Sequence, residues 1–144
     1  MALKLLIIHP DNSFRKHLSE RMRLGNYRAV EACPETEARD MIQRSNFDVV
    51  LLGVSGSYQT SLALLKTIKE LRPYTEVILL TALEVHSLYD SIQAMQLGAF
   101  DDLLVPLDIQ ALHNRIGEAY QRKKQRVKAD RSMIREARNQ RNSG

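Results

Sequence analysis

The sequence predicts an α/β fold in which one parallel sheet is covered by helices on both faces. Short, uninterrupted apolar runs bounded by turn residues are typical of strands buried on both sides. Between them lie segments whose apolar residues recur at helical spacing. The alternation occurs five times, so right-handed crossovers give a doubly wound, five-stranded sheet. A length of 144 residues, 44% of them hydrophobic, suffices for one such core.

Turn-forming residues separate the elements expected in the first half of the chain. Residues 5–8 form the first strand, and one of the polar residues 11–13 caps the helix that follows, because its side-chain oxygen can accept a free backbone N–H. That helix ends at Gly25. The next elements are a strand at 27–32, a helix at 35–44 and a strand at 49–52, which Gly53 ends.

The second half continues the alternation and ends in a long helix. Gly98 suits the left-handed conformation that commonly closes a helix. The expected elements are a helix with apolar residues at 62, 65 and 68, a strand at 77–80, a helix marked by apolar residues at 88, 92 and 95, a strand at 103–105, and a helix that starts from Asp108 and continues beyond Ala119.

Charge divides the chain into a body, residues 1–119, and a basic helical extension or linker, residues 120–144. The extension holds nine Lys and Arg against two Asp and Glu, whereas the whole chain has a net charge of +4. Clustered cations can bind nucleic acid through its phosphates, or they can keep a linker or dimerisation helix solvated. The second interpretation is favoured, because no aromatic residue follows Tyr120 to stack on bases.

Composition also excludes several classes of protein. Cys33 is the single cysteine, which rules out an internal disulfide and a cysteine-based zinc site. The apolar runs are far shorter than the ~20 residues that cross a bilayer. We therefore expect a cytoplasmic protein with no membrane partner.

Four segments resemble the receiver domains of bacterial two-component response regulators. They are LLIIHPDNSFR at 5–15, DVVLLG at 48–53, LTA at 80–82 and GAFDDLLVPLD at 98–108. The resemblance covers residues 3–121. It implies the flavodoxin-like receiver fold, with strand order 2-1-3-4-5, followed here by an extended C-terminal helix.

The resemblance fails at the positions where the family does its chemistry. In the family, an acidic pair and an acceptor aspartate hold Mg²⁺, the aspartate takes a phosphoryl group, and a lysine and a hydroxyl residue bind it. Here the acceptor position falls on Gly53, and only the hydroxyl is retained. The degenerate pocket positions are His9 and Pro10 for the acidic pair, the neighbouring Asp11, Gly53, Thr81, and Val105 for the lysine.

These losses remove the chemistry that a phosphorylation site needs. Mg²⁺ prefers oxygen ligands, Gly53 carries no nucleophile, and Val105 supplies no cation to balance a phosphate. The sequence therefore predicts a non-phosphorylatable receiver domain that is not an enzyme. It would use no metal or cofactor and would signal through protein–protein contact.

The resemblance also implies a partner surface on the fourth helix, fifth strand and fifth helix. Its partner would be a signalling protein or an output domain, with a homodimer through the last helix as a further expectation. The aromatic switch residue of the family falls on Asp102. The nominated surface residues are Tyr89, Gln93, Asp102, His113 and Arg115.

Two alternatives remain open at this stage. One is a regulator whose basic C-terminal helix contacts nucleic acid, or the receiver part of a longer transcriptional or signalling regulator. The other is an enzyme or small-ligand binder using the strand-end pocket, where His9, Asp11 and Thr81 are the polar groups.

Three further acidic residues have structural interpretations. Asp48 precedes its strand and is expected to be solvated or to cap a turn. Asp101 and Asp102 are neighbours on a strand, so their side chains point to opposite faces and cannot chelate one ion together.

Overall fold

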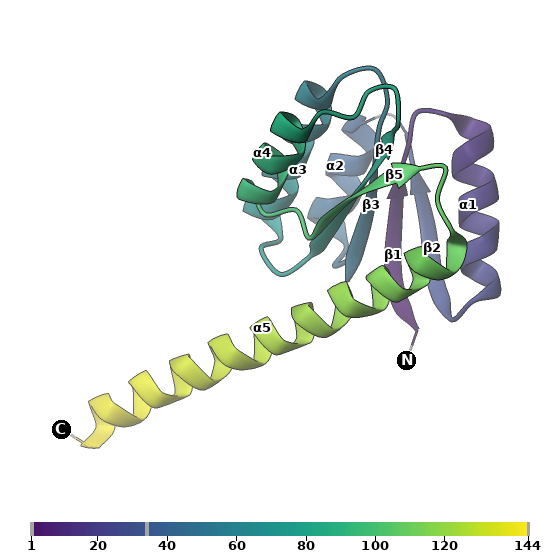
Figure 1. Ribbon diagram of the computed structural model, residues 1–144. Coiled ribbons are helices and arrows are strands. Elements are labelled where there is room, and N and C mark those ends of the chain that lie inside the picture. Colours follow the sequence, from purple (N-terminus) through teal and green to yellow (C-terminus); the bar gives the residue numbers. More distant parts are fainter. Residues whose placement is uncertain (1, 34, 144) are drawn as a thin grey trace.

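The computed structural model describes residues 2–33 and 35–143 and has the predicted architecture (Figure 1). Met1, Pro34 and Gly144, which belong to the two segments predicted from charge, lie outside the described residues. The strands are β1 (Leu3–Ile8), β2 (Tyr27–Ala32), β3 (Val49–Val54), β4 (Glu76–Ala82) and β5 (Asp101–Val105). The helices are α1 (Asn12–Leu24), α2 (Glu35–Arg44), α3 (Tyr58–Leu71), α4 (Leu88–Gln96) and α5 (Ile109–Ser143).

The five strands form one parallel sheet in the order β2-β1-β3-β4-β5, which confirms the expected topology. Consecutive strand residues face opposite sides of the sheet, and both sides are covered. Leu5, Leu51 and Ile78 pack under α1 and α5. Leu6 and Leu79 belong to the core on the other side, under α2, α3 and α4.

Four strands are longer than the apolar runs alone predict. β1 begins at Leu3, β4 extends over Glu76–Ala82, and β3 and β5 are lengthened beside β4. β3 continues through Gly53 to Val54, and β5 begins at Asp101. Both additions pair with β4: Gly53 lies beside Leu80, and Asp101 beside Ile78. Backbone hydrogen bonding to a neighbouring strand therefore extends β3 and β5 beyond their apolar residues.

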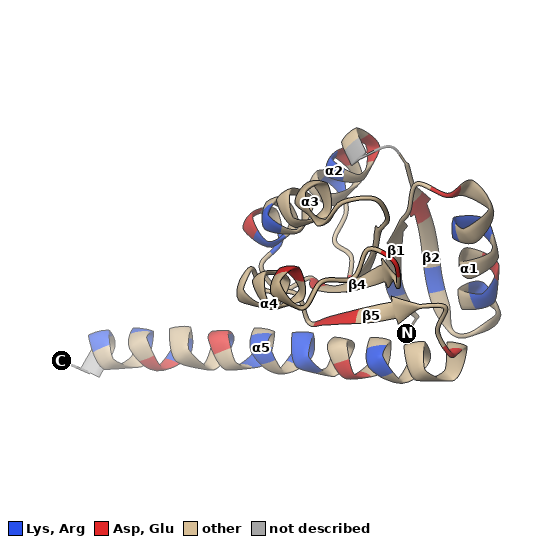
Figure 2. Cartoon of the chain, turned by 45° about the horizontal axis from the view of Figure 1, so that its top comes forward, with Lys and Arg blue, Asp and Glu red and all other residues tan. Residues whose placement is uncertain are grey.

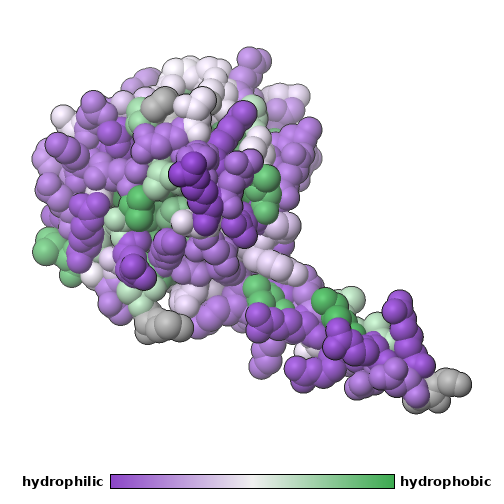
Figure 3. All heavy atoms as spheres, turned by 180° about the vertical axis from the view of Figure 1, so that it is seen from behind, coloured by the Kyte–Doolittle hydropathy of each residue, from purple (hydrophilic) through white to green (hydrophobic). Residues whose placement is uncertain are grey.

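The long C-terminal helix is present as predicted. Its first turns bury Leu112 and Ile116 against the sheet, and the helix then projects beyond the rest of the molecule (Figure 1). We call its described residues 120–143 the extension. Seen from behind, the extension carries small apolar groups among hydrophilic atoms (Figure 3). Met133 and Ile134, both well exposed, are the large apolar residues on which pairing of two copies through this helix would depend.

Within the part of the chain that the structure describes, no helix is both long enough and apolar enough to span a membrane.

Candidate functional site

The positions identified by the resemblance lie at the carboxyl edge of the sheet. His9 follows β1, Gly53 is inside β3, Thr81 is inside β4 and Val105 ends β5. In an open parallel sheet this edge is where ligands and chemistry gather. The fold therefore brings all four strand ends to one place, and the side chains there decide what the site can do.

The imidazole of His9 fills the space above Gly53. A Cβ atom built on Gly53 would lie 2.2 Å from Cδ2 and 2.8 Å from Cγ of His9, far closer than real Cβ contacts. A glycine inside a strand often marks such a close approach. Glycine is therefore required at position 53 as long as His9 keeps this orientation.

Three contacts hold His9 in place. Its Nδ1 accepts the backbone N–H of Asp11 at 3.0 Å, its ring contacts that of Phe14, and its carbonyl oxygen accepts Nη1 of Arg15 at 2.5 Å. Burial lowers the pKa of His9 below its usual value, with the nearby carboxylate of Asp11 opposing that shift and Arg15 adding to it. Burial and the hydrogen bond that Nδ1 accepts both favour the neutral form of the ring.

Asp11, the remaining carboxylate beside His9, has a structural contact of its own. Its Oδ1 accepts the N–H of Phe14 at 3.1 Å and so caps α1, while Pro10 beside it is exposed. Among the described residues, no three His, Cys, Asp or Glu side chains come together in a way that could hold a metal ion.

Thr81, the retained hydroxyl, donates its hydrogen bond to Oδ1 of Asp102. The other carboxylate oxygen of Asp102 accepts from the hydroxyl of Tyr58 at 2.9 Å. Thr81 and Tyr58 are both buried, and burial is the main cause of a raised pKa at Tyr58. We call these three residues the polar triad. It joins the first residue of α3 to β4 and β5.

Asp101 points to the opposite face from Asp102, as expected for neighbouring strand residues. Its carboxylate pairs with Nε of Arg115 on α5 at 2.7 Å.

The nominated partner residues fall into separate places. Tyr89 and Gln93 lie together on α4, where Nε2 of Gln93 donates to the Tyr89 hydroxyl at 2.9 Å.

The other nominated residues lie elsewhere. Arg115 covers the ring of Phe100. His113 stacks on Tyr27 of β2, with 3.1 Å between its Nδ1 and the tyrosine oxygen, and Asp102 is turned toward the polar triad. Tyr89 and Gln93 therefore share one surface, which His113 and Asp102 do not join.

Val105 is partly buried and packs against the core under α1 and α5. A cavity of about 670 Å³ opens beside Gly53, and its described lining contains no carboxylate, lysine or arginine. It is lined by Ile8, His9, Pro10, Ala32, Cys33, Thr36, Leu52, Gly53, Ser55, Gly56, Ser57, Thr60 and Ser61.

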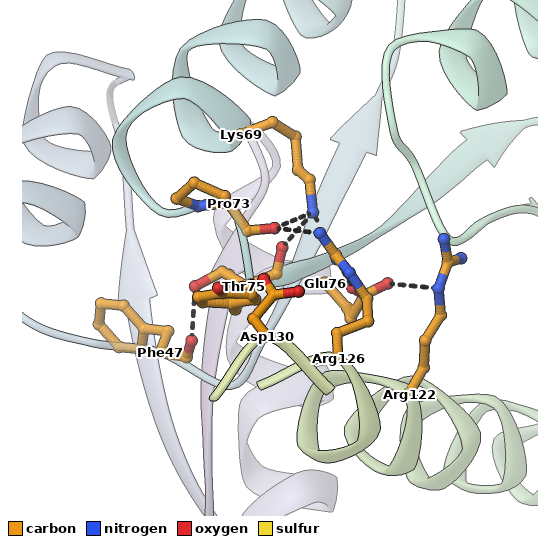
Figure 4. Close-up of polar contacts among 9 residues, drawn as sticks. Phe47, Lys69, Pro73, Thr75, Glu76, Arg122, Arg126 and Asp130 are labelled. Atoms are coloured by element: carbon orange, nitrogen blue, oxygen red, sulfur yellow. Dashed lines mark hydrogen bonds and ion pairs between the residues drawn. The ribbon is translucent and has the colours of Figure 1, made fainter. Parts of the chain in front are cut away.

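Sequence reasoning missed a charged contact at the opposite edge of the sheet (Figure 4). Glu76, the first residue of β4, has a fully buried side chain whose Oε1 lies 2.5 Å from Nη1 of Arg126 on the extension. Lys69 and Arg122 approach the same carboxylate within 4 Å. Glutamate before an apolar run gives no sign of burial, because the cations that make burial tolerable come from α3 and α5.

Asp48 is part of the same attachment, so the expectation that it is solvated or caps a turn is corrected. Its carboxylate lies 2.7 Å from Nζ of Lys123 and also accepts the backbone N–H of Lys4 at 2.8 Å. The hydroxyl of Tyr74 donates to Asp130, which raises the pKa of the tyrosine. The body of the protein therefore contacts the extension as far as Asp130.

Comparison with known proteins agrees with this fold. The model of the response regulator receiver domain family matches residues 5–117. A CheY-like receiver domain from Methanospirillum hungatei superposes with a TM-score of 0.80 over 88% of this chain and 99% of its own, at 20% identity. NtrX from Brucella abortus superposes with a TM-score of 0.79 over 94% of this chain and 29% of its own, at 21% identity. The chain belongs to the response regulator receiver domain family.

Relatives by sequence are longer proteins, of which this chain covers only a part. The transcriptional regulatory protein ZraR of Escherichia coli is 29% identical over 81% of this chain and 26% of its own. The response regulator protein FleR of Pseudomonas aeruginosa is 30% identical over 78% of this chain and 23% of its own. The chain thus spans about a quarter of the length of these two relatives.

Proposed function

We propose that this receiver domain is not phosphorylated at the strand-end position and that it signals through protein–protein contact alone. The close approach of His9 to Gly53 carries the proposal. Position 53 offers no carboxylate to attack a phosphorus atom, and the imidazole takes the space that an acceptor side chain would need.

The electrostatics of the edge support the same proposal. Phosphoryl transfer depends on positioning and on neutralising charge, usually with a metal ion and a cation at the phosphate. Here Val105 is apolar, the nearby cation Arg15 donates to the backbone of His9, and the Asp11 carboxylate caps a helix. The charged groups that an incoming phosphate would approach are therefore already engaged in structural contacts.

The hydrogen bonds of the polar triad support the proposal that the domain keeps one conformation in the absence of a partner. The hydroxyl of Thr81 already donates to Asp102, and Tyr58 fixes the second oxygen of that carboxylate. A change of conformation requires something that binds the two states differently. With no phosphate to draw Thr81 away, that role falls to a protein partner.

The surface proposed for that partner is α4 together with the outer face of β5. Large apolar side chains are exposed there side by side, with Leu88 71% and Tyr89 69% accessible, and exposed apolar groups of this kind mark interaction sites. Ile92, Met95 and Leu104 extend the patch.

Incubation with acetyl phosphate and Mg²⁺ tests the first half of the proposal. We expect the intact mass to remain unchanged under conditions in which an ordinary receiver domain gains one phosphoryl group. The variant Asp11→Asn is the control, because it removes the remaining carboxylate beside His9. A hydroxylamine-labile adduct on the wild-type chain would contradict the proposal, and its loss in Asp11→Asn would identify the acceptor.

Photocrosslinking in the cells that make the protein tests the second half. A photoreactive phenylalanine analogue at Tyr89 is expected to give a discrete protein adduct that weakens when Ile92→Asp is added. The control position is Leu24, which is 86% exposed at the far end of α1. No adduct at position 89, or the same adduct from position 24, would count against α4 as the partner surface.

A further inference from the structure

Five cations of the extension lie on one face of the helix. Lys124, Lys128, Arg131, Arg135 and Arg138 follow one another at intervals of four and three residues, which is the spacing of a single helical face. All five are exposed. We call them the basic stripe. It presents about one charge per turn over ~21 Å.

The stripe differs from the other cations of the extension in what surrounds it. Arg122, Lys123 and Arg126 pair with the carboxylates of Glu76 and Asp48 and thereby attach the helix to the body. By contrast, no residue three or four positions from any member of the stripe is acidic. The stripe therefore lacks the helical ion pairs that usually offset such charge.

A groove runs between the stripe and the start of β3. Its volume is about 580 Å³, and four members of the stripe line it with Asn46 across from them. Asp48, the carboxylate of the groove, is already paired with Lys123 at 2.7 Å. Figure 2 shows how basic segments recur along α5 while the helix leaves the body. The groove thus carries unbalanced positive charge.

We infer that the basic stripe binds the phosphate backbone of double-stranded DNA. A straight helix with regularly spaced cations complements a regularly spaced polyanion, and such contacts are independent of sequence. The absence of aromatic residues from 121 to 144 disfavours single strands, whose bases stack on aromatic platforms. This contact is additional to the proposed partner surface on α4, and neither depends on the other.

The test is fluorescence anisotropy of the full chain with a 20-base-pair duplex of arbitrary sequence. Five phosphate contacts predict a slope of about −4.5 for log K against log salt, so that affinity falls about 500-fold between ~50 and ~200 mM salt. With Lys128, Arg131, Arg135 and Arg138 all replaced by Gln, we expect the slope to shrink to about −1.

A matched variant distinguishes the effect of the basic stripe on DNA binding from the effect of net charge. Replacing Lys16, Arg21, Arg39 and Lys66 with Gln removes the same charge from exposed positions on α1, α2 and α3. This variant is expected to retain the wild-type slope, and circular dichroism checks that both variants keep their helix content. Equal losses in the two variants, no binding at ~50 mM salt, or equally tight binding to single-stranded DNA or polyglutamate would overturn the inference.

Discussion

Replacing Gly53 with alanine is expected to lower the free energy of unfolding by about 1–3 kcal/mol, the usual cost of overpacking a close-packed interior. The added Cβ would lie 2.2 Å from Cδ2 of His9, so the imidazole must leave its place. Leaving costs the ring its contact with Phe14 and the hydrogen bond from the N–H of Asp11. Urea denaturation of the two proteins measures the difference.

A double-mutant cycle shows whether His9 is the cause. In the background of His9→Ala, the Gly53→Ala change should cost much less, because the space it needs is already empty. Gly117→Ala is the control, since nothing lies within 4 Å of its added Cβ and alanine favours a helix. A cost at position 53 that His9→Ala does not reduce would remove the main support for the proposed function.

The fold could be predicted from the sequence because its determinants are local. Local patterns indicate which element forms and which side of it is buried. Examples are the apolar run at residues 49–52 and the spacing of Leu112 and Ile116. Five alternations then leave few topologies open. The predicted order of the strands is confirmed.

The site could be predicted only in part, because contacts between distant residues decide it. The sequence placed Gly53 where a side chain is missing, but the orientation of the His9 ring above it depends on Phe14 and Arg15. Strand alternation put Asp101 and Asp102 on opposite faces, yet it could not show that Tyr58, 44 residues away, would bind the second.

Replacing Arg126 with methionine is expected to destabilise the protein by about 2–3 kcal/mol, the range for removing a charged hydrogen-bond partner from a buried carboxylate. Glu76 is fully buried, and Arg126 is the residue that hydrogen-bonds it, through Nη1 at 2.5 Å (Figure 4). Lys69 and Arg122 would remain at 3.9 and 3.8 Å, close enough to limit the loss but without a hydrogen bond. Methionine keeps the length and apolar stem, so the change removes the charge together with the hydrogen bond that Nη2 donates to the carbonyl oxygen of Pro73 at 3.0 Å.

Arg122→Met provides the matched control for that measurement. Arg122 approaches the other oxygen of Glu76 without a hydrogen bond and is half exposed, so its loss should cost under about 1 kcal/mol. Combining Arg126→Met with Glu76→Met should recover part of the stability, because the buried carboxylate is gone, whereas Lys69, only 14% exposed, loses its ion pair. Faster amide exchange over residues 123–130 in Arg126→Met alone would show that this contact attaches the extension to the body. If Arg126→Met and Arg122→Met lose equal stability, the hydrogen bond to the buried carboxylate is not what attaches the extension. Another contact must then set the direction in which the helix presents the basic stripe.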